Sequence, residues 1–265
     1  MVQRFARVGT AKGPRFVELA DDGAWFLEEA PWVAIRRGEK VADFEALPLL
    51  TPSAAGKIVA IGQNYRKHAA EMGKPVPAEP LIFMKPATAL NPHGAVIELP
   101  LASEEVHHEA ELGLVIGKTL KNASEAEAAE GIFASTCFND VTARDIQRRE
   151  IQHTRAKSYD TFACCGPVMV RGLSPADLRV VARVNGDLKQ DGRTSDMVFS
   201  PAALVSFISS IMTLVPGDVI STGTPSGVGP IRDGDVVEVE IEGVGVLKNP
   251  VARASARPSA GDREE

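Results

Sequence analysis

Short apolar segments that end at a glycine, a proline or an Asn-Gly turn recur along the chain, and they restrict it to a strand-rich fold. The runs at 57–62 and 81–86 and the alternating run at 233–251 have the lengths of strands and strand pairs. Asn185-Gly186 is the dipeptide of a tight hairpin. Helical patterns are few, at 64–74, 124–135 and, most clearly, 200–214. The sequence therefore predicts a β-rich α+β fold.

A change in composition near residue 52 divides the chain. Residues 1–52 predict a small N-terminal β-rich domain, in which the turn DDG joins RFVELA to AWFLEE as a hairpin. The Pro, Ser and Gly of TPSAAG (51–56) mark the boundary. We expect the catalytic domain over 53–251 and a disordered tail over 252–265.

Charge and cysteine usage limit the partners. A net charge of −6 and a pI near 5.5 argue against nucleic acid or an anionic membrane as the main partner. No apolar run approaches the roughly 18 residues of a membrane helix, and the N-terminus has no signal-peptide core. The three cysteines, Cys137, Cys164 and Cys165, have no zinc-like spacing. We expect core thiols and a cytoplasmic protein.

The stretch HHEAELGLVIG (107–117) places two carboxylates at the start of an apolar strand. Residues i and i+2 of a strand share a face, so Glu109 and Glu111 lie side by side. Ala110 and the apolar residues at 112, 114 and 116 face the core. Either this is a solvated acidic face, with His107 exposed on it, or it is part of an oxygen-ligand site for a divalent cation.

A cation site needs a third carboxylate, and Asp140 in FNDVTARDIQ is the candidate. It follows residues that look buried and precedes a polar turn. Three carboxylates with open positions for water or substrate suit Mg²⁺ or Mn²⁺. The alternative is an acidic residue that only forms the turn.

His68 and Glu71 are three residues apart on a predicted helix and share a face. A carboxylate that binds one imidazole nitrogen makes the other a better base, although the pair can equally be a solvated helical contact. Arg144, Gln147 and Lys157 are candidates for holding an anionic substrate, against the alternative of surface salt bridges.

The glycine-rich loop TGTPSGVG (222–229) lacks the Lys-Ser/Thr of a P-loop. Its backbone amides and the hydroxyl of Thr224 can hold a carboxylate, or the loop can be a plain tight turn. His93 and His153 look like loop residues.

Taken together, these motifs resemble the fumarylacetoacetate hydrolase family over residues 57–251. The resemblance rests on their order along the chain: GQNYRKHAAE, LIFMKPATAL, HHEAELGLVIGK, NDVTARDIQ, KSYDTF, GP at 166–167, VNGDLKQDGRTSDM and PGDVISTGTPSGVG. It implies a β-roll or sandwich fold, a small N-terminal domain and a homodimer.

The resemblance also implies roles for single residues. Glu109, Glu111 and Asp140 match the family's ligands for Mg²⁺ or Mn²⁺, with Ca²⁺ as a further candidate. His68 and Glu71 match the dyad that activates water. Positions that hold substrate or stabilise negative charge are matched by Arg144, Gln147, Lys157 and Thr224.

The activity that follows is metal-dependent hydrolysis of a C–C bond in 3-acylpyruvates (2,4-dioxo acids) such as fumarylpyruvate or acetylpyruvate, a reaction type of aromatic catabolism. Two alternatives use the same site. One is isomerisation or tautomerisation of 2-hydroxymuconate-type diacids such as 2-hydroxyhepta-2,4-diene-1,7-dioate, and the other is decarboxylation of oxaloacetate. A third, of another class, is a catalytically silent metal-binding protein.

Overall fold

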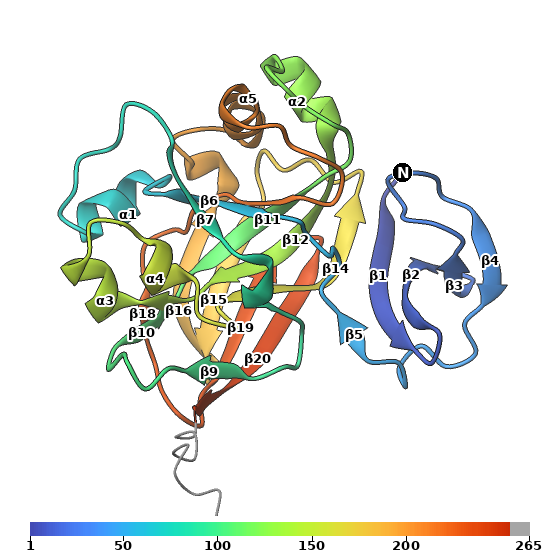
Figure 1. Cartoon of the computed structure of the whole chain (residues 1–265), viewed down its shortest axis with the longest axis horizontal. Helices are drawn as coiled ribbons and strands as arrows, with labels where there is room; N and C mark the ends of the chain where they lie inside the picture. The colour runs from blue at the N-terminus through green and yellow to red at the C-terminus, as the bar shows by residue number, and fades with distance from the viewer. Residues whose placement is uncertain (255–265) are drawn as a thin grey trace, which may run out of the picture.

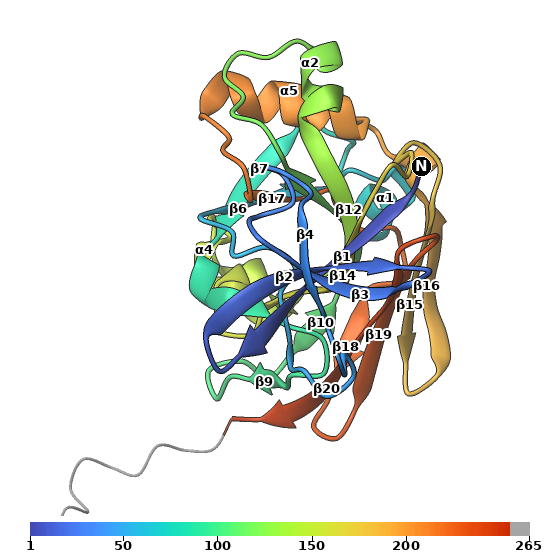
Figure 2. The same ribbon diagram turned by 90° about the vertical axis from the view of Figure 1, so that its right-hand side faces the viewer.

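A long twisted sheet connects the two ends of the molecule in the computed structural model, which describes residues 1–254 (Figures 1 and 2). Ten of its twelve strands form one path. In spatial order they are β4 (Arg37–Lys40), β3 (Gly23–Leu27), β2 (Gly13–Ala20), β1 (Gln3–Thr10), β14 (Ala163–Arg171), β12 (Ile132–Asp140), β11 (Ala110–Ile116), β17 (Val219–Ser221), β6 (Ile58–Gly62) and β7 (Leu81–Lys85). Off this path, β5 (Leu49–Leu50) pairs with β1 and β8 (Leu90–Asn91) with β14.

A second sheet of five strands closes the other side of the core. Its order is β16 (Asp187–Arg193), β15 (Arg179–Val184), β19 (Val236–Ile241), β20 (Gly245–Arg253) and β9 (Ile97–Leu99). One hydrophobic cluster contains Leu112 and Leu114 of β11 together with Val180 of β15 and Val239 of β19. The two sheets therefore pack face to face, as in a sandwich or roll.

A small third sheet and the helices complete the catalytic part. The sheet is β13 (Thr142–Ala143), β10 (Val106–His108) and β18 (Gly229–Ile231). The helices are α1 (Arg66–Glu71), α2 (Glu125–Gly131), α3 (Arg144–Arg149), α4 (Thr154–Lys157) and α5 (Pro201–Ile211), with 3₁₀ turns at Ala87–Ala89 and Thr194–Asp196. In Figure 1, α1, α3 and α4 gather at one side of the sheets, and α2 and α5 lie together above them.

Local sequence signals account for several of these boundaries. Asn185 and Gly186 both have positive φ, 55° and 86°, as the turn between β15 and β16 requires. Ser124 and Glu127 form a capping box at the start of α2. Ser200 caps α5, and Pro201 occupies its first turn. The expected hairpin at DDG is also present, as β2 pairs with β3 from Ala20 opposite Gly23.

Residues 1–52 form strands β1 to β5, which lie beside the rest of the molecule in Figure 1. They are not separate from its sheet, because Gln3 to Phe5 of β1 pair with Met169 to Arg171 of β14. At the other end, β20 runs to Arg253, so residues 252 and 253 of the expected tail belong to a strand. Residues 255–265 of that tail lie outside the described residues.

The fold class predicted from sequence, β-rich α+β, is confirmed. Among the described residues, no helix is long and apolar enough to span a membrane. Helix α5 ends at Ile211, which is 49% exposed, so the helical pattern predicted to 214 runs too far. Leu214 is nevertheless buried, where it bridges to Leu120 in an extended conformation.

Candidate metal centre and active site

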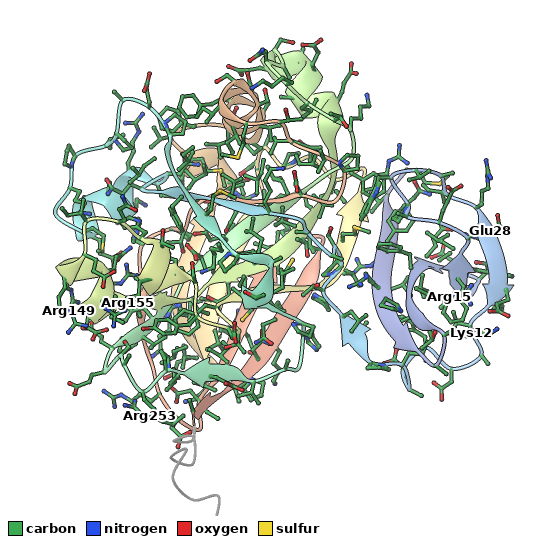
Figure 3. The ribbon with its side chains drawn as sticks, viewed as in Figure 1. Lys12, Arg15, Glu28, Arg149, Arg155 and Arg253 are labelled. Atoms are coloured by element: carbon green, nitrogen blue, oxygen red, sulfur yellow. The ribbon has the colours of Figure 1, made fainter. Side chains whose placement is uncertain are left out.

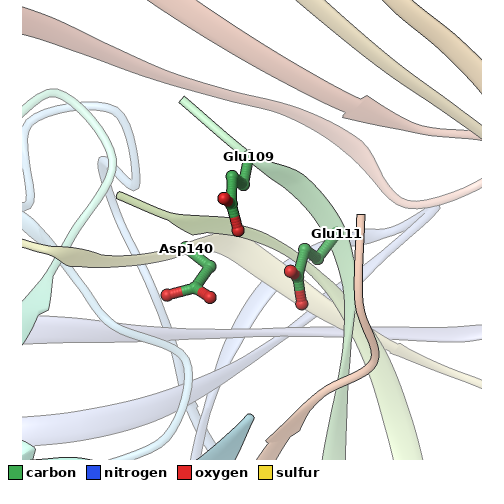
Figure 4. Close-up of side chains that lie close together, drawn as sticks. All are labelled: Glu109, Glu111 and Asp140. Carbon is green, nitrogen blue, oxygen red and sulfur yellow. The ribbon is translucent and has the colours of Figure 1, made fainter. Parts of the chain in front are cut away.

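Three acidic side chains, Glu109, Glu111 and Asp140, lie together where β11 and β12 meet (Figure 4). Each offers a carboxylate oxygen within 4.8 Å of the other two, and their exposed fractions are 4%, 1% and 1%. The Asp140 N–H donates to the Glu109 carbonyl over 2.9 Å, which sets the register at this point. The structure thus brings together the three carboxylates that the sequence grouped.

The local geometry differs from a continuous strand. β10 ends at His108 and β11 begins at Ala110, so Glu109 lies in the break between two strands. The two glutamates still face the cluster, while Ala110 and Leu112 lie in the hydrophobic core as predicted. The break lets β10 leave for the small sheet with β13 and β18 without turning Glu109 away from Glu111.

Buried cations surround Glu109 and Asp140. Lys157 Nζ donates to Glu109 Oε2 over 2.9 Å and to Asp140 Oδ2 over 2.6 Å. Lys85 Nζ donates to Asp140 Oδ1 over 2.6 Å, and Arg144 donates to Glu109 Oε1. Burial alone would raise the pKa of Glu109, but Lys157 and Arg144 hold this pKa well below its usual range. Glu109 is therefore an ionised carboxylate.

Glu111 has a different environment. Burial raises its pKa well above the usual range, and the charges of Asp140 and Glu109 raise it further. Its Oε2 accepts hydrogen bonds from Ser221 Oγ and from the Gly223 N–H (2.8 Å). Oε1 accepts none from the described residues. A hard divalent cation would offset this repulsion, and an all-oxygen donor set is the one that such cations prefer. The residues present therefore fit a divalent metal ion.

The expected dyad is formed on α1. His68 Nδ1 lies 3.0 Å from Glu71 Oε2, and the His68 side chain is 7% exposed. A carboxylate only accepts, so Nδ1 carries the proton and Nε2 keeps its lone pair. The other oxygen of Glu71 accepts the Gly227 N–H over 3.0 Å, which ties α1 to the glycine-rich loop.

His68, the two glutamates, Lys157 and Arg144 line one small cavity of about 30 Å³. Arg144, Gln147, Lys157 and Thr224, the candidates for substrate binding, lie on its wall. The lining also includes Gln63, Met72, Lys74, Phe83 and His153, to which the sequence analysis gave no role. The His153 and Phe83 rings make an edge contact, with centroids 5.4 Å apart.

The Thr224 hydroxyl is already committed within the protein. It donates to the Ala110 carbonyl over 2.8 Å and accepts from Gln190 Nε2 over 2.7 Å. Gln190 also donates to the Pro225 carbonyl and accepts the Ala110 N–H. The hydroxyl therefore fixes the loop to β11, and the proton of this hydroxyl is not free for a substrate carboxylate.

Two of these residues were missed by sequence reasoning. Lys85 ends the strand LIFMK, and a lysine before a proline reads as a solvated strand end. Its spacing of two from Phe83 was the available signal, because the two share a face of β7, on which Phe83 contacts Lys157 and Lys85 contacts Asp140. Gln190 follows a hairpin turn and lies far from the site in sequence; the signal available for it was its place in the motif VNGDLKQDGRTSDM.

Other residues behave partly as expected. The three cysteines are free and buried, as predicted for core thiols. His107 was expected to be exposed, and this is wrong, because the residue is only 9% exposed and lies against Arg144. The neighbouring arginines Arg148, Arg149 and Arg155 make surface salt bridges, and Arg149 and Arg155 are labelled in Figure 3.

Comparisons with known proteins agree with this geometry. A family model described as fumarylacetoacetate (FAA) hydrolase C-terminal matches residues 57–252. A solved 2-hydroxyhepta-2,4-diene-1,7-dioate isomerase from Mycobacterium marinum superimposes with a TM-score of 0.88 at 41% identity, over 96% of this chain and 100% of that chain. The mitochondrial oxaloacetate tautomerase FAHD1 of Bos taurus is 40% identical over 74% of this chain and 91% of its own length. The oxaloacetate tautomerase YisK of Bacillus subtilis is 40% identical over 76% and 71%.

Proposed function

Because the chain belongs to the fumarylacetoacetate hydrolase family, we propose that it is a metal-dependent tautomerase or isomerase of small 2-oxo diacids, with oxaloacetate as the first candidate substrate. The carrying observation is a buried carboxylate triad, two of whose members, Glu109 and Glu111, line one cavity together with His68, Lys157 and Arg144. The relatives named above act, by their names, on oxaloacetate or on a hydroxydienedioate. These relatives favour tautomerisation or isomerisation over acylpyruvate hydrolysis, which stays a prediction.

The charges around the cavity favour a dianionic substrate. Three carboxylates (Glu109, Glu111 and Asp140) face three buried cations (Lys85, Lys157 and Arg144), so their formal charges sum to zero when all are ionised. A divalent cation then leaves two positive charges in a buried site, which a dicarboxylate would neutralise.

Glu109, Glu111 and Asp140 would hold the metal, with Mg²⁺ and Mn²⁺ as the candidates and Ca²⁺ as a further one. When bound, the ion supplies Lewis acidity toward the oxygens of the 2-oxo acid. Lys157 has three N–H donors and uses two of them on the carboxylates, which leaves one for a substrate oxygen. Burial opposes protonation of Lys157, but Asp140 and Glu109 hold its pKa above the usual value, so the donor stays charged.

His68 is the candidate base. Its Nε2 lone pair would take a proton from C3 of the oxo acid, and the proton would return to the C2 oxygen to give the enol. The reverse transfer gives the keto form. Glu71 keeps the Nδ1 proton in place during this exchange. No carbon–carbon bond needs to break, and the same groups serve either direction.

A second candidate is the C–C hydrolase expected from sequence. The observation in its favour is the His68–Glu71 pair itself, because an oriented imidazole that removes a proton from carbon can equally remove one from water. Decarboxylation of oxaloacetate would use the same cations. A homodimer also remains a proposal, which size-exclusion chromatography with light scattering would test.

The deciding experiment gives oxaloacetate and acetylpyruvate to EDTA-treated protein, with and without added Mg²⁺ or Mn²⁺, and follows them by NMR. Faster keto–enol exchange of oxaloacetate with all carbons retained supports the tautomerase. Acetate and pyruvate from acetylpyruvate support the hydrolase, and CO₂ with pyruvate from oxaloacetate supports the decarboxylase. Metal ion alone serves as the blank. Tight metal binding without turnover of either acid would support the third alternative, a catalytically silent metal-binding protein.

A further inference from the structure

The guanidinium of Arg144 is held on three sides by acceptors of this chain. Its Nε donates to His107 Nδ1 over 3.4 Å, one terminal nitrogen donates to Gln147 Oε1, and the other donates to Glu109 Oε1. Arginine has five N–H donors, so two remain, one on each terminal nitrogen. That is the number that a bidentate contact with a carboxylate uses.

His107 reaches Arg144 because two short strands pair beside it. Val106 of β10 lies opposite Ala143 of β13, and the Arg144 N–H donates to the Glu105 carbonyl over 2.7 Å. The chain therefore places the His107 ring and the start of α3 next to each other. The His107 side chain is only 11% exposed, so water competes little for its ring nitrogens.

The partners of His107 determine which ring nitrogen carries the proton. Arginine can only donate, so Nδ1, which faces Arg144, must be the acceptor. The other nitrogen, Nε2, lies 2.8 Å from Glu105 Oε1, and an ionised carboxylate can only accept. Arg148 donates to both oxygens of Glu105, over 2.6 and 2.8 Å, and keeps that carboxylate in position.

We propose that His107 is a positioning residue for substrate binding, which fixes the guanidinium plane of Arg144 through Nδ1 while Glu105 fixes the Nε2–H tautomer. This rests on the proposed function, in which Arg144 contacts a carboxylate of the oxo acid. Without the ring acceptor, one buried N–H of Arg144 has no partner and the guanidinium can rotate away from the substrate. His107 touches neither the substrate nor the carboxylate triad in this scheme.

The test compares H107F, which keeps a ring but has no acceptor, with H107N, whose Oδ1 takes the place of Nδ1. With oxaloacetate and Mg²⁺, we expect H107F to raise KM about tenfold, the cost of one buried hydrogen bond to a charged group, with kcat within about threefold of wild type. H107N should restore KM. H93F is the matched control, because His93 Nδ1 also accepts one N–H, that of Lys248, but lies away from the site.

Two results would overturn the proposal. One is an unchanged KM in H107F; the other is a fall in kcat and thermal stability that H107N shares, which would make the ring a structural group only. A readout independent of activity is the ¹⁵N NMR spectrum of the His107 ring, which should show Nε2 protonated in the wild type. Protonation at Nδ1 instead would refute the positioning role. If the wild type turns over neither acid, the proposed function fails while the tautomer result still decides the role of His107.

Discussion

Lys85 and Asp140 form an ion pair that is closed off from solvent, with Nζ 2.6 Å from Oδ1 and side-chain exposures of 0% and 1%. They are 55 residues apart in the chain, on β7 and at the end of β12. Burial lowers the pKa of Lys85, although Asp140 acts in the opposite direction. A lysine in this position takes part in setting the charge that a metal ion would meet.

Replacing this lysine should weaken the fold and strengthen metal binding. K85M leaves the Asp140 carboxylate buried with one cation fewer, which costs about 3–5 kcal/mol of unfolding free energy. The extra negative charge should bind Mn²⁺ more tightly, so added Mn²⁺ should stabilise K85M more than wild type in urea denaturation. K57M is the control, because Lys57 pairs with buried Asp218 away from the triad. An equal Mn²⁺ increment in K85M and wild type would contradict the prediction.

Removal of the candidate base should abolish most turnover without affecting the metal. We expect H68A to lower kcat by about 10²–10⁴-fold, the usual contribution of a general base. E71Q should lower it less, because the carboxylate orients the ring and is itself one-third exposed. Isothermal titration with Mn²⁺ should give wild-type affinity in both variants, since neither residue belongs to the triad. Near-normal turnover in H68A would exclude this role.

The pH dependence of stability should contain a contribution from His108. Burial lowers the pKa of this ring to about 4, and its Nδ1 lies 3.1 Å from Gln190 Oε1. Between about pH 6.5 and pH 4 the unfolded chain binds a proton that the folded chain does not. The unfolding free energy therefore falls as the pH drops through this window, by about 3 kcal/mol at most. H108Q should lose this part of the slope in urea denaturation at several pH values. Parallel curves for the two proteins would refute it.

Lys74, in the cavity lining, should favour substrates that carry a second carboxylate. The pKa of the His153 ring is lowered most by burial, next by the charge of Lys157 and then by the charge of Lys74. K74M should raise KM for oxaloacetate about two- to fivefold, as expected for an exposed ion pair, and leave KM for acetylpyruvate unchanged. K67M tests whether any lysine of this region has the effect, since Lys67 is exposed on α1 and does not line the cavity. An equal change in KM for both acids would show that Lys74 does not contact the second carboxylate of oxaloacetate.

The two glutamates of the triad could be predicted from local periodicity, whereas Asp140 was assigned through the family motif. Glu109 and Glu111 are two residues apart beside an apolar strand, and Asp140 ends the strand that pairs with it. His68 and Glu71 follow the same logic on a helix. Short-range patterns of this kind fix which side chains share a face, whatever the rest of the fold does.

The remainder depended on contacts between distant segments. Lys85 reaches Asp140 across four sheet positions, and Gln190 joins the loop at 224–225 to β11 from the second sheet. His107 looked exposed because a histidine on an acidic face reads as solvated, yet β13 and α3 cover it. Strand order is set by the packing of the whole core, so these partners appear only once the sheets are assembled.

β1 covers the backbone edge of β14 at Met169, Val170 and Arg171, and Phe5 packs on Phe133 with ring centroids 5.7 Å apart. A chain that lacks residues 1–52 would leave that strand edge unpaired and expose the Phe133 ring. Open edges invite strands from other molecules, so such a fragment should aggregate even with its triad intact. None of residues 1–52 lines the cavity. The N-terminal segment thus prevents edge-to-edge strand pairing at β14, although it contributes no side chain to the site.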